Sequence, residues 1–180
     1  LLRTRFPEAR YVDLLAAVAG PFMPVPVVVH KGFEPPSFVD PTTLVVAISA
    51  SGDSPEAVAS ATTCVEAGGR LFAVTSGGQL GALADQQAAP TVFLPVATTP
   101  TPTRARIGAL SVPVLRAFED IGLFPGARDW IAAAVDQLRV RRDELAQDGN
   151  AAAALARELG GTIPLVYGGG AAGGVAASRW

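Results

Sequence analysis

Three serines lie close together in the segment Ser49-Ala50-Ser51-Gly52-Asp53-Ser54. Hydroxyl groups and backbone amides donate hydrogen bonds, and the oxygens of a phosphate monoester accept them. Ser54 is a typical N-cap residue, and the Pro55 that follows is typical of a first helical position. A helix N-terminus leaves amides unpaired and carries a partial positive charge. We therefore expect Ser49, Ser51, Ser54 and the amide of Gly52 to bind a phosphate, the alternative being that the serines fill a tight turn and cap a helix.

The segments around these serines predict a strand–loop–helix–strand unit. The apolar run 43–48 is typical of a strand buried on both faces of a parallel sheet. A helix is predicted over 55–67 and a second strand over 71–75, which ends at Thr75 and is followed by Ser76. Ligands of open α/β sheets bind at the carboxyl ends of the strands, so these two residues are candidates to line the same pocket. Glu56, in the first turn of the helix, is a third candidate to line the pocket, and for it interaction with the helix dipole is favoured over a catalytic role.

The pattern Ser49-x-Ser51-Gly52-Asp53-Ser54-x-Glu56, followed by a helix, a strand and Thr75-Ser76-Gly77-Gly78, resembles the phosphate loop of sugar isomerase (SIS) domains. From about Val25 to Trp180, the order of elements resembles the bifunctional phosphoglucose/phosphomannose isomerases, in an actinobacterial-like form. The resemblance implies a three-layer αβα sandwich with a parallel, flavodoxin-like sheet. It also implies interconversion of glucose 6-phosphate or mannose 6-phosphate with fructose 6-phosphate.

The same resemblance implies how the chain is divided. Residues 1–103 would form a first SIS domain, 104–161 linker helices packed on it, and 162–180 the beginning of a second SIS domain. The family leads us to expect an opening strand and a Gly-Met-Gly-Gly-Ser-like loop, and the segment before Val25 contains no such loop.

Two arginines, Arg104 and Arg106, lie where a Pro- and Thr-rich loop leads into a predicted helix over 104–122. In the isomerases that this chain resembles, an arginine in such a context stabilises the enediolate intermediate. Arg104, followed by Ala105, fits that context better than Arg106 does. The alternative is an ordinary surface arginine.

Aldose–ketose isomerisation also needs a base and an acid. The family's glutamate and histidine match no residue of this chain, and His30 is predicted to be structural or to line a rim. We expect the chain by itself to bind sugar phosphates weakly without isomerising them. Other predicted elements are helices over 7–19, 79–87, 126–147 and 151–159, and strands over 24–30, 91–94 and 162–167.

Two other functions are compatible with the sequence. One is a non-catalytic SIS module that senses a sugar phosphate and regulates a partner. The other is a dinucleotide-binding oxidoreductase, because Gly168-x-Gly170-x-x-Gly173 follows a predicted strand and precedes a predicted helix. That function also requires an acidic residue about 20 positions further on.

The amino-acid composition argues against several classes of protein. Of the 180 residues 49% are hydrophobic and 17% charged, which argues against disorder and predicts a covered surface. The net charge of −2 predicts neither nucleic-acid binding nor electrostatic membrane attachment. One cysteine, Cys64, and one histidine exclude an internal disulfide and a conventional His/Cys metal site, and no cofactor is expected. We predict a cytoplasmic homodimer that binds a small sugar phosphate.

Overall fold

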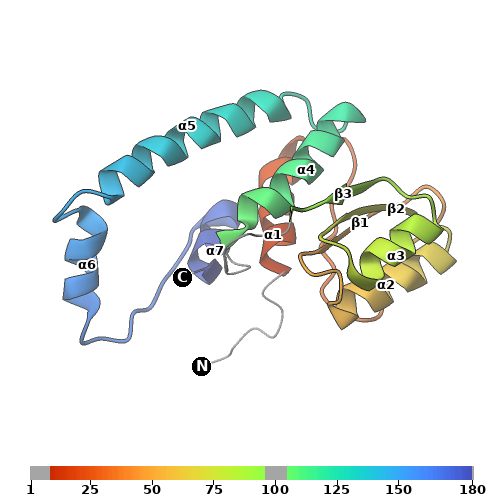
Figure 1. Ribbon diagram of the computed structural model, residues 1–180, viewed down its shortest axis with the longest axis horizontal. Coiled ribbons are helices and arrows are strands. Elements are labelled where there is room, and N and C mark those ends of the chain that lie inside the picture. The colour runs from red at the N-terminus through yellow and green to blue at the C-terminus, as the bar shows by residue number, and fades with distance from the viewer. Residues whose placement is uncertain (1–8, 96–104, 180) are drawn as a thin grey trace.

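The computed structural model describes residues 9–95 and 105–179, and shows a parallel sheet between two layers of helices (Figure 1). The strands are β1 (Leu44–Ser49), β2 (Arg70–Thr75) and β3 (Thr91–Phe93), in the order β1-β2-β3. Leu44 lies opposite Arg70, and Ser49 lies opposite Thr75. The first two strands therefore end at the same level, each on a hydroxyl-bearing residue.

Successive strand residues point to opposite faces of the sheet, and here they are apolar on both faces. Helices therefore cover both faces. The helices α2 (Pro55–Glu66) and α3 (Gly78–Gln86) pack on Ala47, Leu71 and Ala73. On the opposite face lie α1 (Ala9–Ala19) and α4 (Ile107–Asp120). The predicted αβα sandwich with a parallel sheet is confirmed.

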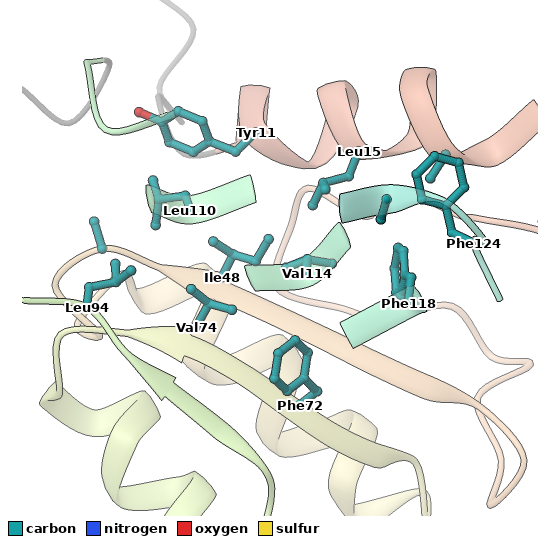
Figure 2. Close-up of a cluster of buried hydrophobic side chains, with 13 residues drawn as sticks. Tyr11, Leu15, Ile48, Phe72, Val74, Leu94, Leu110, Val114, Phe118 and Phe124 are labelled. Carbon is teal, nitrogen blue, oxygen red and sulfur yellow. The ribbon is translucent and has the colours of Figure 1, made fainter. Parts of the chain in front are cut away.

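The larger core lies on the face covered by α1 and α4 (Figure 2). Ile48, Phe72 and Val74 project from the strands towards side chains of both helices. The helical members labelled there are Tyr11, Leu15, Leu110, Val114 and Phe118. Because α4 lies between α1 and the sheet in this cluster, its apolar side chains hold the two together.

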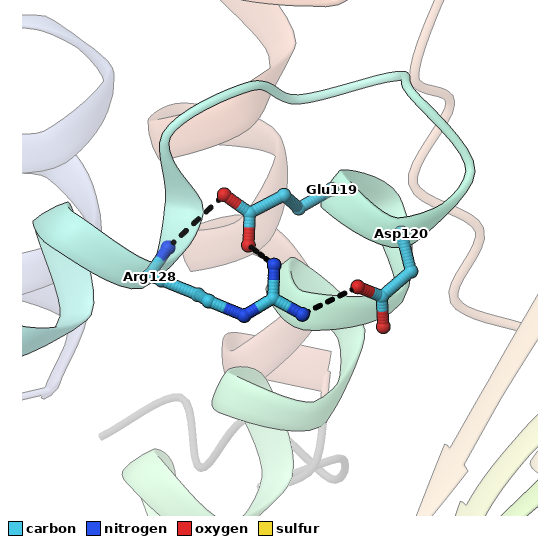
Figure 3. A network of polar contacts seen from close by, with 3 residues as sticks. All are labelled: Glu119, Asp120 and Arg128. Atoms are coloured by element: carbon cyan, nitrogen blue, oxygen red, sulfur yellow. Dashed lines mark hydrogen bonds and ion pairs between the residues drawn. The ribbon is translucent and has the colours of Figure 1, made fainter.

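Beyond α4 the chain forms an arm that leads away from the sheet (Figure 1). It consists of α5 (Ala127–Leu145), α6 (Ala151–Leu159) and an extended segment, after which α7 (Gly170–Arg179) returns to pack on α1. The base of the arm is anchored by Arg128, whose guanidinium donates to Glu119 and Asp120 of α4, both at 2.6 Å (Figure 3). These two hydrogen-bonded carboxylates, with Asp120 first, raise the pKa of Arg128.

An aromatic cluster joins the start of α5 to the short 3-10 helix η1 (Gly20–Phe22). The Trp130 ring lies edge-on to Phe22 and Phe124, with ring centroids 5.1 and 5.3 Å away. The arm is thus fixed at its base by aromatic packing and by ion pairs. Further along α5 most side chains are exposed.

Two of the predicted strands are wrong, because neither segment has a strand beside it. The structure forms no strand at residues 24–30 or 162–167. A strand exists only where a neighbour takes up its backbone N–H and C=O groups. The helix behind the glycine loop begins at Gly170, whereas the sequence predicts a start at Val175. The helix predicted from Arg104 begins at Ile107 within the described residues.

Candidate functional site

Residues Ser49–Ser54, here called the serine loop, begin at the carboxyl end of β1. Ser49 is fully buried, and its Oγ accepts a hydrogen bond from the amide of Gly52 at 3.1 Å. The same oxygen lies 3.0 Å from Oγ of Ser54. Ser51 is exposed, and its Oγ accepts from the amide of Asp53 at 3.2 Å. Two of the hydroxyls therefore hold the shape of the loop by accepting from its own amides.

The serine loop leads directly into α2, as the sequence predicts. Ser54 has an extended backbone, and its carbonyl accepts from the amide of Val58 at 3.0 Å, so Ser54 is the N-cap residue. Its side chain forms no capping hydrogen bond to the helix and instead faces Ser49. The N-terminus of α2 therefore lies beside the serine loop, and its backbone amides have no side-chain cap from Ser54.

The end of β2 forms a second turn against the serine loop. Thr75 is fully buried, and its Oγ1 donates to the carbonyl of Gly77 at 2.9 Å and accepts from the Gly77 amide at 3.2 Å. The amide of Ser76 donates to the carbonyl of Ala50 at 3.2 Å. Gly52 has a φ of 84°, and a Cβ there would lie 1.8 Å from the Gly77 oxygen. The two turns are packed so closely that Gly52 has no room for a side chain.

Asp53 has a role that the sequence analysis did not assign. Its Oδ1 accepts from the amide of Gln79 at 3.0 Å, and the carbonyl of Gly52 accepts from the amide of Leu80 at 2.9 Å. The first turn of α3 is thus capped by the serine loop. Asp is a preferred capping residue, but this partner lies 26 positions away in the sequence, so no local pattern indicates it. Of the two helices that begin here, α2 is the one whose amide end has no side-chain cap.

Of the two candidate arginines, Arg104 lies outside the described residues. Arg106 is half-buried at the start of α4, and its guanidinium donates to the carbonyl of Pro95 at 3.2 Å. Pro95 follows β3 closely, so Arg106 lies at the same carboxyl edge of the sheet as the serine loop. This contact is to the backbone, which gives Arg106 a structural role there.

A cavity of about 770 Å³ runs along the free edge of β1. Its lining includes Ser54 and Glu56 at the start of α2, together with His30, whose Nε2 lies 3.1 Å from the carbonyl of Gly32. Ser49, Ser51, Gly52, Thr75 and Ser76 do not line it. Among the predicted residues, the structure thus places Ser54 and Glu56 at the cavity, and the others in or beside the two interlocked turns.

The rest of the cavity is mostly apolar. Cys64 of α2 is one of its lining residues, and burial raises the pKa of the Cys64 thiol. A thiol with a raised pKa stays protonated near neutral pH and is a poor nucleophile. In the part of the chain that the structure describes, no helix combines the length and the apolar character needed to cross a membrane.

Comparison with known proteins identifies relatives with one shared name. A protein of Caldicellulosiruptor bescii called bifunctional phosphoglucose/phosphomannose isomerase is 30% identical over 160 residues, which are 87% of this chain and 46% of that protein. Proteins of the same name from Thermoplasma acidophilum and Thermoplasma volcanium are 31% identical over 93 residues and 29% over 145 residues. These matches cover 52% and 79% of this chain, and 28% and 42% of the two relatives. The chain spans less than half the length of the curated relatives it matches, and no family model matches it.

Proposed function

This chain is a relative of the bifunctional phosphoglucose/phosphomannose isomerases, and on that basis we propose that it carries the phosphate-binding part of a sugar-phosphate site. The substrates would be glucose 6-phosphate or mannose 6-phosphate and fructose 6-phosphate. The observation that supports this most is the position of the serine loop at the carboxyl end of β1, where the N-terminus of α2 begins.

The hydrogen bonds of the serine loop favour an acceptor ligand. The Ser51 hydroxyl accepts from an amide of its own loop, so its hydrogen is left to donate outwards, and the side chain is exposed. Ser49 and Ser54 lie beside it, with their hydroxyl oxygens 3.0 Å apart. A phosphate held here would also benefit from the positive end of the α2 dipole.

The isomerase chemistry itself requires more than this loop. In the proposed reaction Arg104 stabilises the charge that develops on the enediolate, and a base and an acid from outside the matched residues move the protons. We accordingly propose that residues 1–103 are the first sugar-phosphate domain, 104–161 a linker and 162–180 the beginning of a second domain. By itself the chain binds the sugar phosphate and does not turn it over, and the assembled enzyme is a homodimer.

Isothermal titration of fructose 6-phosphate into the chain tests the proposal. We expect binding that Ser51→Ala weakens by about tenfold or more, because a hydrogen bond to a charged group contributes about 1.5–3 kcal/mol. Ser51 is exposed, and circular dichroism of the variant checks that the fold is kept. A Ser49→Ala/Ser51→Ala variant should bind more weakly still, and Ser178→Ala, which removes an exposed serine of α7, serves as the matched control.

Free fructose and NAD are the ligand controls. Fructose should not bind at concentrations at which fructose 6-phosphate does, because the phosphate supplies the acceptors. Unchanged affinity in the double serine variant would contradict the assignment of the serine loop. Binding of NAD without binding of the sugar phosphate would contradict the sugar-phosphate proposal and favour a dinucleotide site at Gly168–Gly173.

A further inference from the structure

Glu56 carries a negative charge that phosphate binding by the serine loop does not require. It is the second residue of α2, it is half-buried, and it lines the cavity beside β1 together with Ser54. Cα–Cβ bonds in a helix tilt towards its N-terminus, so the Glu56 side chain leans towards the serine loop. Glu56 therefore lies where the proposed phosphate position meets the cavity.

The acidic side chains in and directly after the serine loop differ in their contacts. Asp53 accepts a hydrogen bond from the amide of Gln79 and so caps α3. The carboxylate of Glu56 forms no hydrogen bond or ion pair with any other residue that the structure describes. The dipole of α2 stabilises a negative charge at this position, but it does not use the hydrogen-bonding capacity of the carboxylate oxygens. Glu56 is thus a half-buried acceptor that can bind donors of a ligand.

The basic side chains that line the same cavity have other partners. Nζ of Lys31 lies 2.6 Å from Oδ2 of Asp13 on α1, and Nε2 of His30 lies 3.1 Å from the carbonyl of Gly32. Of the described residues that line the cavity, Glu56 alone has a carboxylate side chain. Its charge is therefore not neutralised by an ion pair across the cavity.

A ligand that consisted of a phosphate alone would bind more weakly because of Glu56. Like charges repel, and the phosphate and the carboxylate would share the positive end of one helix dipole. Sugar hydroxyls, in contrast, donate hydrogen bonds that a carboxylate accepts. The cavity volume of about 770 Å³ falls within the range of about 300–1,000 Å³ that is typical of small-molecule sites. The arrangement favours a ligand that combines a phosphate with hydroxyl groups.

We propose that Glu56 distinguishes sugar phosphates from other phosphate monoesters, by accepting hydrogen bonds from sugar hydroxyls while the serine loop holds the phosphate. This inference rests on the proposed function, because it requires the phosphate to lie at the serine loop. The charge of Glu56 weakens the binding of every phosphate monoester. Its hydrogen bonds compensate for that loss only where the ligand carries hydroxyl groups beside the phosphate.

Isothermal titration with two ligands tests the role of Glu56. One is fructose 6-phosphate, and the other is methyl phosphate, a monoester without hydroxyl groups. At about pH 8 both are dianions, because the second pKa of a phosphate monoester is about 6. The ratio of their dissociation constants therefore cancels the electrostatic effect on the phosphate and reports the contacts of the sugar. We expect the wild-type chain to bind fructose 6-phosphate more tightly than methyl phosphate.

Glu56→Ala should reduce this preference by about tenfold or more, because hydrogen bonds to a charged acceptor are lost. Glu56→Gln keeps a neutral acceptor and should reduce the preference less. Both variants should bind methyl phosphate a few-fold more tightly, since a like charge is removed. Glu66→Gln changes an exposed acid about 15 Å further along α2 and is the matched control, which should leave both dissociation constants unchanged. Circular dichroism checks that each variant keeps the fold.

Three results would overturn the proposal. Equal affinities of the wild-type chain for the two ligands would mean that the sugar makes no contact. A preference that persists in Glu56→Ala would assign the sugar contact to another residue. In both of these cases the phosphate site itself stands if Ser51→Ala weakens the binding of both ligands by the same factor. Binding of neither ligand to the folded wild-type chain would contradict the proposed function together with this inference.

Discussion

At the scale of single residues, Gly52 is the point where the serine loop and the Thr75–Gly78 turn come closest. Its φ of 84° favours glycine, and any side chain would collide with the carbonyl of Gly77. The same contact brings the end of β1 against the end of β2, where the candidate site lies. The conformation of the loop is thus determined by a backbone contact as well as by the serine hydroxyls.

Gly52→Ala should destabilise the protein by at least about 1–2 kcal/mol, the cost of a left-handed conformation alone, with the collision adding to it. Chemical denaturation measures the change in the free energy of unfolding. Gly108→Ala is the control, because a Cβ at Gly108 meets no atom within 4 Å and lies in α4. The control should leave stability unchanged or raise it by up to about 1 kcal/mol. Equal losses in both variants would contradict the steric argument.

Asp40 is a second residue whose environment leads to a measurable prediction. Its carboxylate accepts from the hydroxyl and amide of Thr42, at 2.7 and 2.8 Å, and from the hydroxyl of Thr43 at 3.1 Å. These hydrogen bonds, that of the Thr42 hydroxyl above all, lower the pKa of Asp40 below the ordinary value of 3.8 for an aspartate. The turn that they form brings the chain into β1.

A lowered pKa in the folded state means that the ionised carboxylate stabilises the fold above pH 3.8 and that this stabilisation is lost as the pH falls through the folded-state value. Asp40→Asn should therefore lower the denaturation midpoint at pH 6 and make less difference at pH 3. Asp148→Asn, at an exposed carboxylate of the turn after α5, is the control. A difference that stays constant between the two pH values would show that Asp40 does not titrate in this range.

At the scale of elements, the sheet positions the candidate site, and the helix N-termini that begin there carry a partial positive charge. The parallel register places the ends of β1 and β2 side by side, and the serine loop then caps α3 through Asp53 while leaving α2 without a side-chain cap. Two helix N-termini at one edge of the sheet thus have different roles. One is used to hold the loop, and the other is proposed to hold the phosphate.

The arm is a separate element whose attachment can be tested. Trp130 contacts Phe22 and Phe124 edge-on, and such aromatic pairs contribute about 0.5–1.5 kcal/mol beyond the area they bury. Trp130→Ala should increase hydrogen exchange in the first turns of α5 while leaving β1–β3 unchanged. Trp130→Phe should retain most of the protection. Faster exchange throughout the sheet would instead mean that α5 is part of the core's cooperative unit.

At the scale of the whole molecule, one core joins α1, α4 and the sheet. Leu110 of α4 is fully buried in it, so Leu110→Ala should reduce the free energy of unfolding by about 2–5 kcal/mol. Leu138→Ala removes the same atoms from an exposed position of α5 and should change it by less than about 0.5 kcal/mol. Denaturation followed by circular dichroism measures both. A small effect of Leu110→Ala would mean that α4 is not part of the core.

Much of the fold could be predicted from local sequence. Ser54-Pro55 predicts the start of α2, and the apolar run before Ser49 predicts β1, because capping chemistry and burial on both faces act within a few residues. The resemblance to the isomerases, read from the serine pattern, is confirmed by the three relatives. The role of Arg104, the phosphate contacts and the homodimer stay predictions.

Only the tertiary structure decided which segments became strands and which partners the loop residues took. Val25–Val29 and Thr162–Tyr167 have the composition of strands, but a strand also needs a neighbour, and neither segment has one beside it. Ser54 is the N-cap residue of α2, as the sequence predicts, but its side chain meets Ser49, and the side chain of Asp53 reaches α3. The sequence by itself determines where an element can begin and which faces are apolar, because those depend on nearby residues. Pairing depends on what the rest of the chain brings alongside.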